Sequence, residues 1–282
     1  MKEFNKAIFE ISIAAILFGL IPIIVKFSEI DSYVLAFGRI IFASIFLFIW
    51  ISLSKTKVQP IKKDKLLFFL FGLFHALIIL FFFIAIKLIN TAIAVLLLYS
   101  GAIYLVVLSA IFLREKIEKI TYISLIVSFI GLFLIFYTPD LKLNFLGYLA
   151  GFSAGFFMSL VFLIGKKLTK SYDRMSMTFF QNLIALPLML PLLFFAKFNW
   201  KFINLFTLII LGVFCTAIAF LLLYSGMKRV KGQKVGLLLL LEVVTPIILA
   251  FVFFREIPQL REIFGGILIL IGFILLIIFH KD

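Results

Sequence analysis

Residues 66–86 read LLFFLFGLFHALIILFFFIAI, and His75 is the one polar side chain among them. With a rise of about 1.5 Å per residue, such a helix is about as long as the hydrocarbon core of a bilayer is thick. A soluble protein could not bury this segment on every side. The segment therefore predicts a membrane-spanning helix.

Apolar segments of this kind recur along the whole chain. Hydrophobic residues make up 65% of the 282 residues and charged residues 14%, whereas a soluble domain has about 45–50% and about 25%. The loops between the segments are too short to fold as separate domains. We therefore predict an all-α membrane protein with ten transmembrane helices, at residues 8–27, 33–53, 66–86, 92–113, 120–137, 145–165, 175–196, 205–226, 234–254 and 262–279.

Lysine and arginine residues are abundant in every second loop. The two termini and the loops within 55–65, 114–119, 166–174 and 228–234 hold nineteen of the 27. Because basic loops stay in the cytoplasm, this asymmetry predicts a multi-pass protein of the cell membrane with both termini cytoplasmic. It also accounts for the net charge of +14 without a nucleic-acid partner. Apart from Arg39, which lies within a span, the others are Lys26, Lys87, Lys142, Lys197, Lys201, Arg255 and Arg261.

The chain carries an internal repeat with an offset of 141 residues, half of its length. Phe112-Leu113-Arg114-Glu115 recurs as Phe253-Phe254-Arg255-Glu256, and Gly131 pairs with Gly272. We predict two five-helix repeats, 1–141 and 142–282, within one integral membrane domain. Five is an odd number, so the second repeat is inverted relative to the first, as in many secondary transporters.

These motifs, in this order, resemble the ten-helix EamA-type branch of the drug/metabolite transporter superfamily. Two positions depart from the family pattern, since Phe18 replaces a tryptophan and Leu105 a proline. The resemblance implies a secondary active transporter of a small metabolite, such as an amino acid or a similar polar or amphipathic solute, and often an exporter. The motifs are Phe18-Gly19, Phe37-Gly38-Arg39, Ala43, the two Arg-Glu motifs, Gly131, Glu242, Pro246, Gly265-Gly266 and Gly272.

Glu242 is the one acidic residue deep within a predicted span, about two turns from its inner end. Ionisable groups in hydrocarbon are costly and are generally functional. Pro246 has no N–H, so it leaves the backbone carbonyl of Glu242 without its helical hydrogen bond. We predict that Glu242 binds substrate and exchanges a proton during transport. The alternative is a structural carboxyl that is protonated or paired with a base.

Four further polar residues are predicted to contact substrate. His75 and Thr216 are related by the offset of 141 and both lie mid-span, where a histidine can transfer a proton near neutral pH. Ser100 and Tyr104 share one face of their span with Gly101. Hydrogen bonds or small-residue contacts that only hold helices together are the alternative for all four.

Other polar residues within or beside spans are given structural roles. We interpret Arg39, about two turns from the outer end of its span, as a side chain that reaches the interface or pairs with an acidic loop residue. Gln181 and Asn182 are expected to bridge helices. The duplicated Arg-Glu motifs stand at helix–loop junctions, where we expect tight turns or gates, with a solvated ion pair as the alternative.

Other classes of function lack the residues they need. There is no nucleotide-binding glycine motif, and one cysteine, Cys215, with two histidines makes a poor metal site. We therefore predict no cofactor, no metal and no catalytic residue. The expected partners are a small-molecule substrate and the lipid bilayer, and a homodimer stays open. The alternatives are a membrane-embedded enzyme acting on lipid, which needs a polar cluster near one interface, and a channel, which needs a continuous polar stripe.

Overall fold

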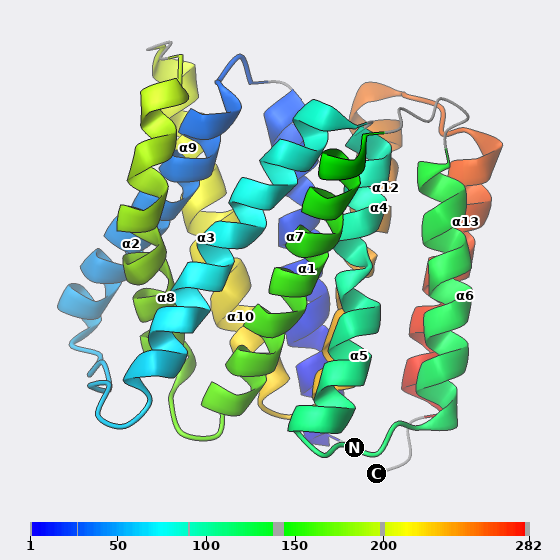
Figure 1. Cartoon of the computed structure of the whole chain (residues 1–282), viewed down its shortest axis with the longest axis horizontal. Coiled ribbons are helices and arrows are strands. Elements are labelled where there is room, and N and C mark those ends of the chain that lie inside the picture. Colours follow the sequence, from blue (N-terminus) through cyan, green and yellow to red (C-terminus); the bar gives the residue numbers. More distant parts are fainter. Residues whose placement is uncertain (1, 27, 90, 138–143, 198–200, 280–282) are drawn as a thin grey trace. The chain divides into compact units, whose positions relative to one another are not determined.

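The computed structural model describes residues 2–26, 28–89, 91–137, 144–197 and 201–279. Within these ranges the chain forms helices joined by short loops and contains no strand (Figure 1). Ten segments are long and apolar enough to cross a membrane, which confirms the predicted number of spans. Two of the basic residues counted above, Lys142 and Lys281, lie outside the described residues.

Four of the ten spans are not single α-helices. One consists of α4 and α5, one of α8 and a 3₁₀ segment, η1, one of α9, a π-helical segment, η2, and α10, and one of α11 and α12. The elements are α1 (Lys2–Lys26), α2 (Ser32–Ser54), α3 (Lys65–Leu88), α4 (Thr91–Tyr99), α5 (Gly101–Phe112), α6 (Lys119–Phe136), α7 (Phe145–Leu168), α8 (Arg174–Met189), η1 (Leu190–Phe195), α9 (Phe202–Gly212), η2 (Val213–Ile218), α10 (Ala219–Met227), α11 (Gly232–Leu239), α12 (Leu241–Phe254) and α13 (Leu260–Ile278).

The chain divides into two compact units. The first unit is Met1–Ala76 with Ile164–Arg229, and the second unit is Leu77–Leu163 with Val230–Asp282. Each unit therefore takes spans from both halves of the sequence. The predicted repeats, 1–141 and 142–282, describe the ancestry of the sequence rather than these units, and their boundary stays a prediction.

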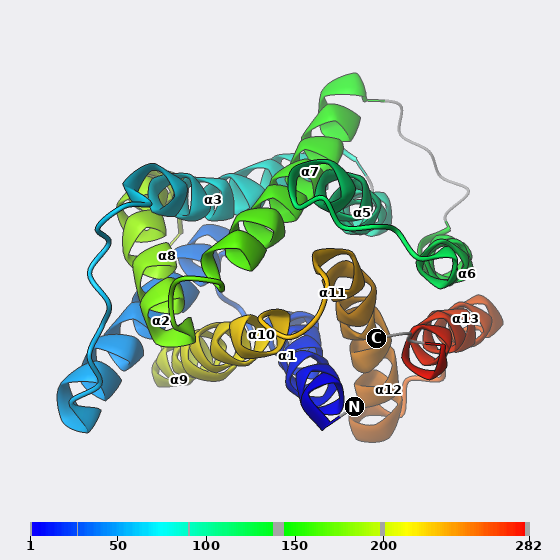
Figure 2. The same ribbon diagram turned by 90° about the horizontal axis from the view of Figure 1, so that it is seen from below.

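Repeat-related spans pack against each other inside each unit. In the second unit α6 contacts α13 and α5 contacts α11, and in the first unit α2 contacts α8 (Figures 1 and 2). Under the offset of 141 residues, each of these pairs consists of equivalent spans. Such self-pairing is what an approximate two-fold axis between the halves produces.

Individual contacts between α6 and α13 obey the same relation. A Cβ added to Gly265 would lie 2.5 Å from the carbonyl oxygen of Gly131, so the two backbones touch. A Cβ added to Gly272 would lie 2.8 Å from the carbonyl oxygen of Ser124. The offset converts Gly131 into Gly272 and Ser124 into Gly265, so one contact is the repeat image of the other. The sequence repeat is therefore also a structural repeat.

The described parts of the densely charged loops in the first unit lie at one end of it. Arg229 pairs with Glu3 at 2.7 Å and with Glu10 at 2.6 Å, which joins the loop after α10 to the start of α1. The backbone N–H of Gln59 donates to Ser176, which joins the loop after α2 to the start of α8. At the other end, Lys201 pairs with Glu29 and its hydrogen bond lowers the pKa of that carboxyl. The loops thus segregate as the charge alternation predicts.

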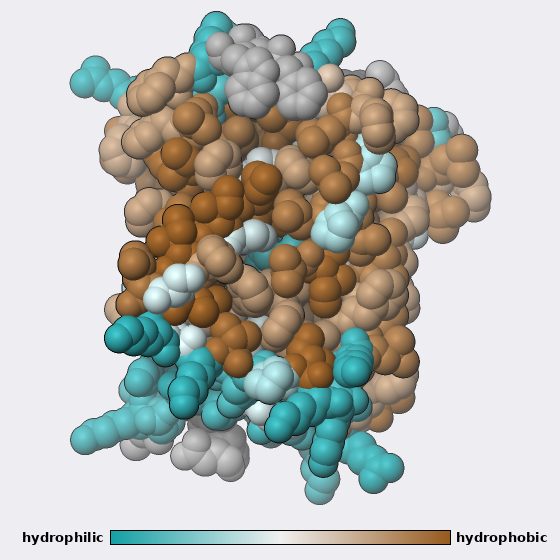
Figure 3. Space-filling model, turned by 90° about the vertical axis from the view of Figure 1, so that its left-hand side faces the viewer, coloured by the Kyte–Doolittle hydropathy of each residue, from teal (hydrophilic) through white to brown (hydrophobic). Residues whose placement is uncertain are grey.

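A broad apolar surface surrounds the helices. Large hydrophobic side chains such as Phe48, Phe194 and Phe202 are mostly exposed, which a soluble monomer of this size does not tolerate over so wide an area. Figure 3 shows an apolar belt on the face that carries α2, α8 and α9, with hydrophilic side chains at both ends and more of them at the lower end. Lipid tails are the natural solvent for such a belt.

The duplicated Arg-Glu motifs form the tight turns that the sequence predicts. Arg114 and Arg255 both have positive φ angles, 53° and 55°, which end α5 and α12. In both turns the backbone N–H of the following glutamate donates to a carbonyl six residues earlier. The Glu115 carboxylate also accepts from the backbone N–H of Gly232 at 2.9 Å, so it caps the start of α11. Both Arg-Glu motifs therefore end a helix in a tight turn. In the first motif the glutamate also caps the start of α11.

A buried ion pair lies beside this cap. The Lys234 side chain is 1% exposed, and its ammonium nitrogen lies 3.0 Å from the Glu118 carboxylate, which also pairs with Lys231 at 2.6 Å. Burial raises the pKa of Glu118, but hydrogen bonds from Lys231 and Lys234 lower it by more, so the net pKa is below its usual value. The pair ties the start of α11 to the start of α6 within the second unit.

Candidate functional site

Two equivalent spans of the second unit are interrupted at mid-length. The fourth span breaks at Ser100, between α4 and α5, and the ninth breaks at Leu240, between α11 and α12. At the breaks the backbone N–H groups of Ile103 and Val243 donate three residues back, to Ser100 and Leu240. Under the offset the two interruptions agree to within one residue. Interrupted spans at corresponding positions of two repeats are where many transporters bind their substrates.

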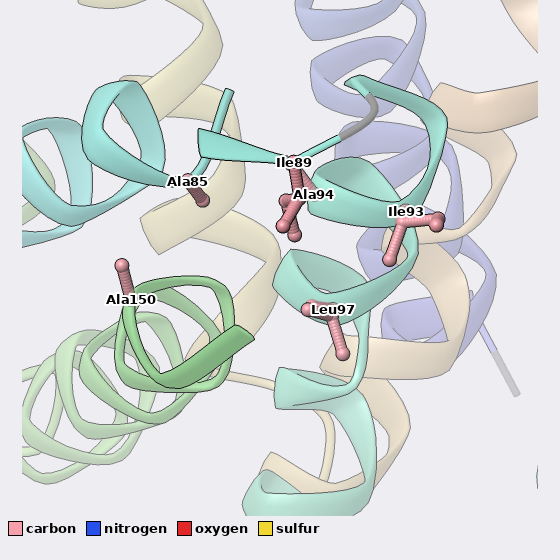
Figure 4. Packing of buried hydrophobic residues seen from close by; sticks show 6 residues of the cluster. All are labelled: Ala85, Ile89, Ile93, Ala94, Leu97 and Ala150. Atoms are coloured by element: carbon pink, nitrogen blue, oxygen red, sulfur yellow. The ribbon is translucent and has the colours of Figure 1, made fainter. Parts of the chain in front are cut away.

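Packing in the second unit fixes the first of these interrupted spans. Ala85 and Ile89 at the end of α3, Ile93, Ala94 and Leu97 on α4, and Ala150 on α7 form one buried apolar cluster (Figure 4). Below this cluster α7 comes so close that a Cβ on Gly155 would lie 2.6 Å from the Leu97 carbonyl oxygen. The break at Ser100 therefore follows a closely packed α4.

Glu242 lies beside the break of the ninth span. The sequence analysis placed it deep within that span but did not predict the break. Its carboxyl group is partly buried and accepts a hydrogen bond from the hydroxyl of Tyr99, the last residue of α4. Tyr99 is 9% exposed. The tyrosine thus joins the two interrupted spans through their one mid-membrane carboxyl. Sequence reasoning missed Tyr99, although it stands next to the predicted residue Ser100.

Ser100 and Tyr104 lie near this break, but the side chains of both contact neighbouring protein groups. The Ser100 hydroxyl donates to the carbonyl of Leu97 at 2.5 Å and is buried against Gly155. The ring of Tyr104 packs edge-on against Phe156 with centroids 6.0 Å apart. Both contacts match the packing alternative for these residues. Their contact with substrate stays a prediction.

His75 and Thr216 lie in the first unit, and the structure adds Arg39 to them. Nε of Arg39 donates to the Thr216 hydroxyl at 3.2 Å, and the His75 ring packs edge-on against Phe220, one turn beyond Thr216. Thr216 is fully buried and His75 is 5% exposed. The sequence interpretation, in which Arg39 reaches the interface or pairs with an acidic loop residue, did not include this hydrogen bond to a buried residue of another span.

Other polar residues of the first unit hold helices together. The Tyr224 hydroxyl donates to the Gln181 side chain at 2.5 Å, which bridges α10 and α8 as predicted for Gln181. The side-chain amide of Asn182 instead donates to the Thr178 carbonyl of its own helix. Cys215 is buried within η2. Among the described residues, no group of three histidines, cysteines or acids is arranged to hold a metal ion.

The predicted site residues, with Tyr99 and Arg39 added by the structure, thus form two clusters. Glu242 and Tyr99, with Ser100 and Tyr104 nearby, belong to the second unit, whereas His75, Thr216 and Arg39 belong to the first. A surface hollow of about 350 Å³ beside Lys62, Lys63 and Tyr172 belongs to neither, because it lies in the loops. The mid-membrane clusters are therefore the candidate functional groups.

Ten apolar spans, repeat-related helix pairs and paired interruptions define a class, the membrane transporters built from two repeats. Residues 5–137 and 145–278 each match the EamA-like transporter family, so the chain belongs to that family. The two matches fit the predicted pair of five-helix repeats.

Relatives agree with this membership. An uncharacterized transporter of Archaeoglobus fulgidus is 30% identical over 264 residues, which cover 93% of each chain. An uncharacterized transporter of Bacillus subtilis, YxxF, is 24% identical over 98% of this chain and 91% of its own. A protein of known crystal structure has the same fold, with a TM-score of 0.83, 18% identity and 96% coverage of both chains. The chain is therefore a multi-pass membrane transporter.

Proposed function

We propose that this transporter exports a small polar or amphipathic metabolite, of the size of an amino acid, by alternating access. The observation that carries the proposal is the pair of interrupted spans, α4–α5 and α11–α12, joined by Tyr99 and Glu242. The two breaks bring the Glu242 carboxyl and the Tyr99 hydroxyl together at mid-membrane, where a polar solute can use them. We assign the chain no catalytic activity, in keeping with its family.

The repeat supplies the mechanism in this proposal. Two halves of similar structure have two arrangements of similar energy, one open to each side of the membrane. Small differential contacts with the solute are then sufficient to shift the balance between them. The proposed setting is the cell membrane with both termini in the cytoplasm, which rests on the segregation of basic loops.

A channel and a membrane-embedded enzyme find less support. A channel needs a continuous polar lining, whereas the described mid-membrane polar residues of each unit form only a small cluster. An enzyme acting on lipid needs catalytic groups near one interface. Near the ends of the described helices, Glu115 instead caps α11 and Glu118 pairs with Lys231.

We expect transport without nucleotide. Liposomes containing the purified protein and loaded with unlabelled amino acid should take up the same labelled amino acid faster than unloaded liposomes, in the absence of ATP. A panel covering apolar, aromatic, basic and acidic amino acids tests the solute class. Internal amino acid should accelerate uptake because it occupies the site while the transporter returns to the state that is open to the outside. Uptake that requires ATP, or that internal solute does not accelerate for any member of the panel, would contradict the proposal.

A further inference from the structure

Two basic loops of the first unit line a hollow that the proposed transport mechanism does not use. The loop between α2 and α3 and the loop between α7 and α8 lie at the same end of this unit (Figure 1). The hollow has a volume of about 350 Å³, and Lys62, Lys63 and Tyr172 are among the residues that line it. Small-molecule sites have volumes of about 300–1,000 Å³. The hollow is therefore large enough for a polar group of modest size.

Contacts between the two loops build the walls of this hollow. The backbone N–H of Gln59 donates to the Ser176 hydroxyl at 2.8 Å, and the backbone N–H of Asp173 donates to the Gln59 side chain at 3.1 Å. The ring of Tyr172 packs edge-on against the buried ring of Phe68, with centroids 4.9 Å apart. The hollow is thus formed by two loops that are joined to each other.

The charge around the hollow is strongly positive. Residues 55–65 hold five lysines and one aspartate, and residues 166–174 hold three lysines, one arginine and one aspartate. The second aspartate, Asp173, accepts from backbone N–H groups at the start of α8, which compensates its charge. Among the described residues, neither Lys62 nor Lys63 forms an ion pair. Their ammonium groups therefore favour an anion in the hollow.

Large apolar side chains follow these lysines directly along the chain. Leu66 and Phe69, in the first two turns of α3, are 69% and 48% exposed, and their spacing of three residues places them on one face of the helix. Lipid tails are the natural solvent for such side chains. A ligand that matches this order has an anionic head group and apolar chains.

We propose that the hollow binds the head group of an anionic phospholipid, with Lys62 and Lys63 donating to its phosphate. Lysine binds phosphate as a compact charge with three donors. In the proposed orientation this end of the unit faces the cytoplasmic leaflet, which carries anionic lipid. Asp64 also lines the hollow, and its charge opposes an anion. A bound lipid contacts both loops and so stabilises the folded protein.

The test measures lipid binding by the full-length protein in a non-ionic detergent. Dioctanoyl phosphatidylglycerol, which is anionic, is compared with dioctanoyl phosphatidylcholine, which has no net charge. Glycerol 3-phosphate and inorganic phosphate, which have no chains, are the free anions. The rise in melting temperature with ligand concentration yields an apparent dissociation constant. We expect phosphatidylglycerol to stabilise the wild type and the other three compounds to do so much less.

Two double variants of one loop separate the hollow from general surface charge. Lys62→Gln with Lys63→Gln should weaken phosphatidylglycerol binding about 10- to 30-fold, because two charged donors are lost. Lys55→Gln with Lys57→Gln removes the same charge from exposed positions that do not line the hollow, and should change binding by less than about threefold. Asp64→Asn should strengthen binding, because it removes the opposing charge.

Ser171 provides a second test in which no lysine is lost. It is exposed and lines the hollow. Ser171→Glu places a negative charge there and should weaken phosphatidylglycerol binding. Ser171→Gln adds a side chain of similar size without the charge, so it should weaken binding less. This pair of variants provides the answer if the lysine variants do not fold.

Three results would overturn the proposal. Equal stabilisation by the two lipids would exclude recognition of an anionic head group. Equal weakening by the two lysine pairs or, if these do not fold, by Ser171→Glu and Ser171→Gln would leave only general surface charge. An effect of glycerol 3-phosphate or phosphate as large as that of the lipid would make the occupant a free anion. Because melting rather than transport is measured, none of these results bears on the proposed export.

Discussion

Glu242→Gln should fold normally and exchange solute, yet lose accumulation driven by a proton gradient. Glutamine keeps the size of the side chain and can still accept from the Tyr99 hydroxyl, but it cannot ionise. For one proton per solute, a gradient of one pH unit supports about tenfold accumulation in wild-type liposomes. The variant should reach a ratio of about one.

Glu256→Gln is the matched control for this experiment. Glu256 is an exposed glutamate at the end of the same span, beside the Arg255 turn, and it lies away from the mid-membrane break. It should accumulate solute as the wild type does. Wild-type accumulation by Glu242→Gln would refute the coupling role. A lower melting temperature with intact coupling would make Glu242 a structural carboxyl, which is the alternative stated from the sequence.

Gly265→Ala should destabilise the protein by about 3 kcal/mol or more. The added Cβ would lie 2.5 Å from the Gly131 carbonyl oxygen, and backbone cannot move aside as a flexible side chain can. It would also lie 2.6 Å from the side-chain Cγ1 of Ile135. The close contact of α6 with α13 would have to open along the interface. Melting of the purified protein should therefore occur roughly 6–12 °C lower.

The neighbouring glycine provides a control of identical chemistry. A Cβ on Gly266 meets only Val244, at 3.9 Å, which is an ordinary contact. Because alanine favours the helix over glycine by up to about 1 kcal/mol, Gly266→Ala should be neutral or slightly stabilising. Equal effects of the two substitutions would contradict the close backbone contact between α6 and α13.

The spans and the repeat could be predicted because both depend on local or periodic properties. Apolar length located all ten spans, and the Arg-Glu motifs located two equivalent turns. The turns could be predicted because the same Arg-Glu motif stands at the end of a helix in each repeat. In both copies the arginine has a positive φ angle. The sequence analysis paired Gly131 with Gly272 as equivalent positions, but the contact of Gly131 with Gly265 became evident only in the structure.

The interruptions and their contacts could not be predicted in the same way. Leu240 stands among leucines, and no glycine or proline marks it, so the break there depends on tertiary packing. Tyr99 reaches Glu242 only because two distant spans come together at their breaks. The hydrogen bond from Arg39 to Thr216 could not be predicted because sequence gives the depth of the arginine but not the direction of its side chain.

The proposed transport mechanism requires that the second repeat be inverted in the membrane relative to the first. One labelling measurement tests this inversion. Lys116 and Ile257 are equivalent under the offset of 141, and both are exposed beside the Arg-Glu turns. Single cysteines at these positions, with Cys215→Ser in the background, are treated in intact cells with a membrane-impermeant maleimide. The inverted repeat predicts labelling of Ile257→Cys from outside and of Lys116→Cys only after the cells are opened. Labelling of both positions from the same side would contradict it.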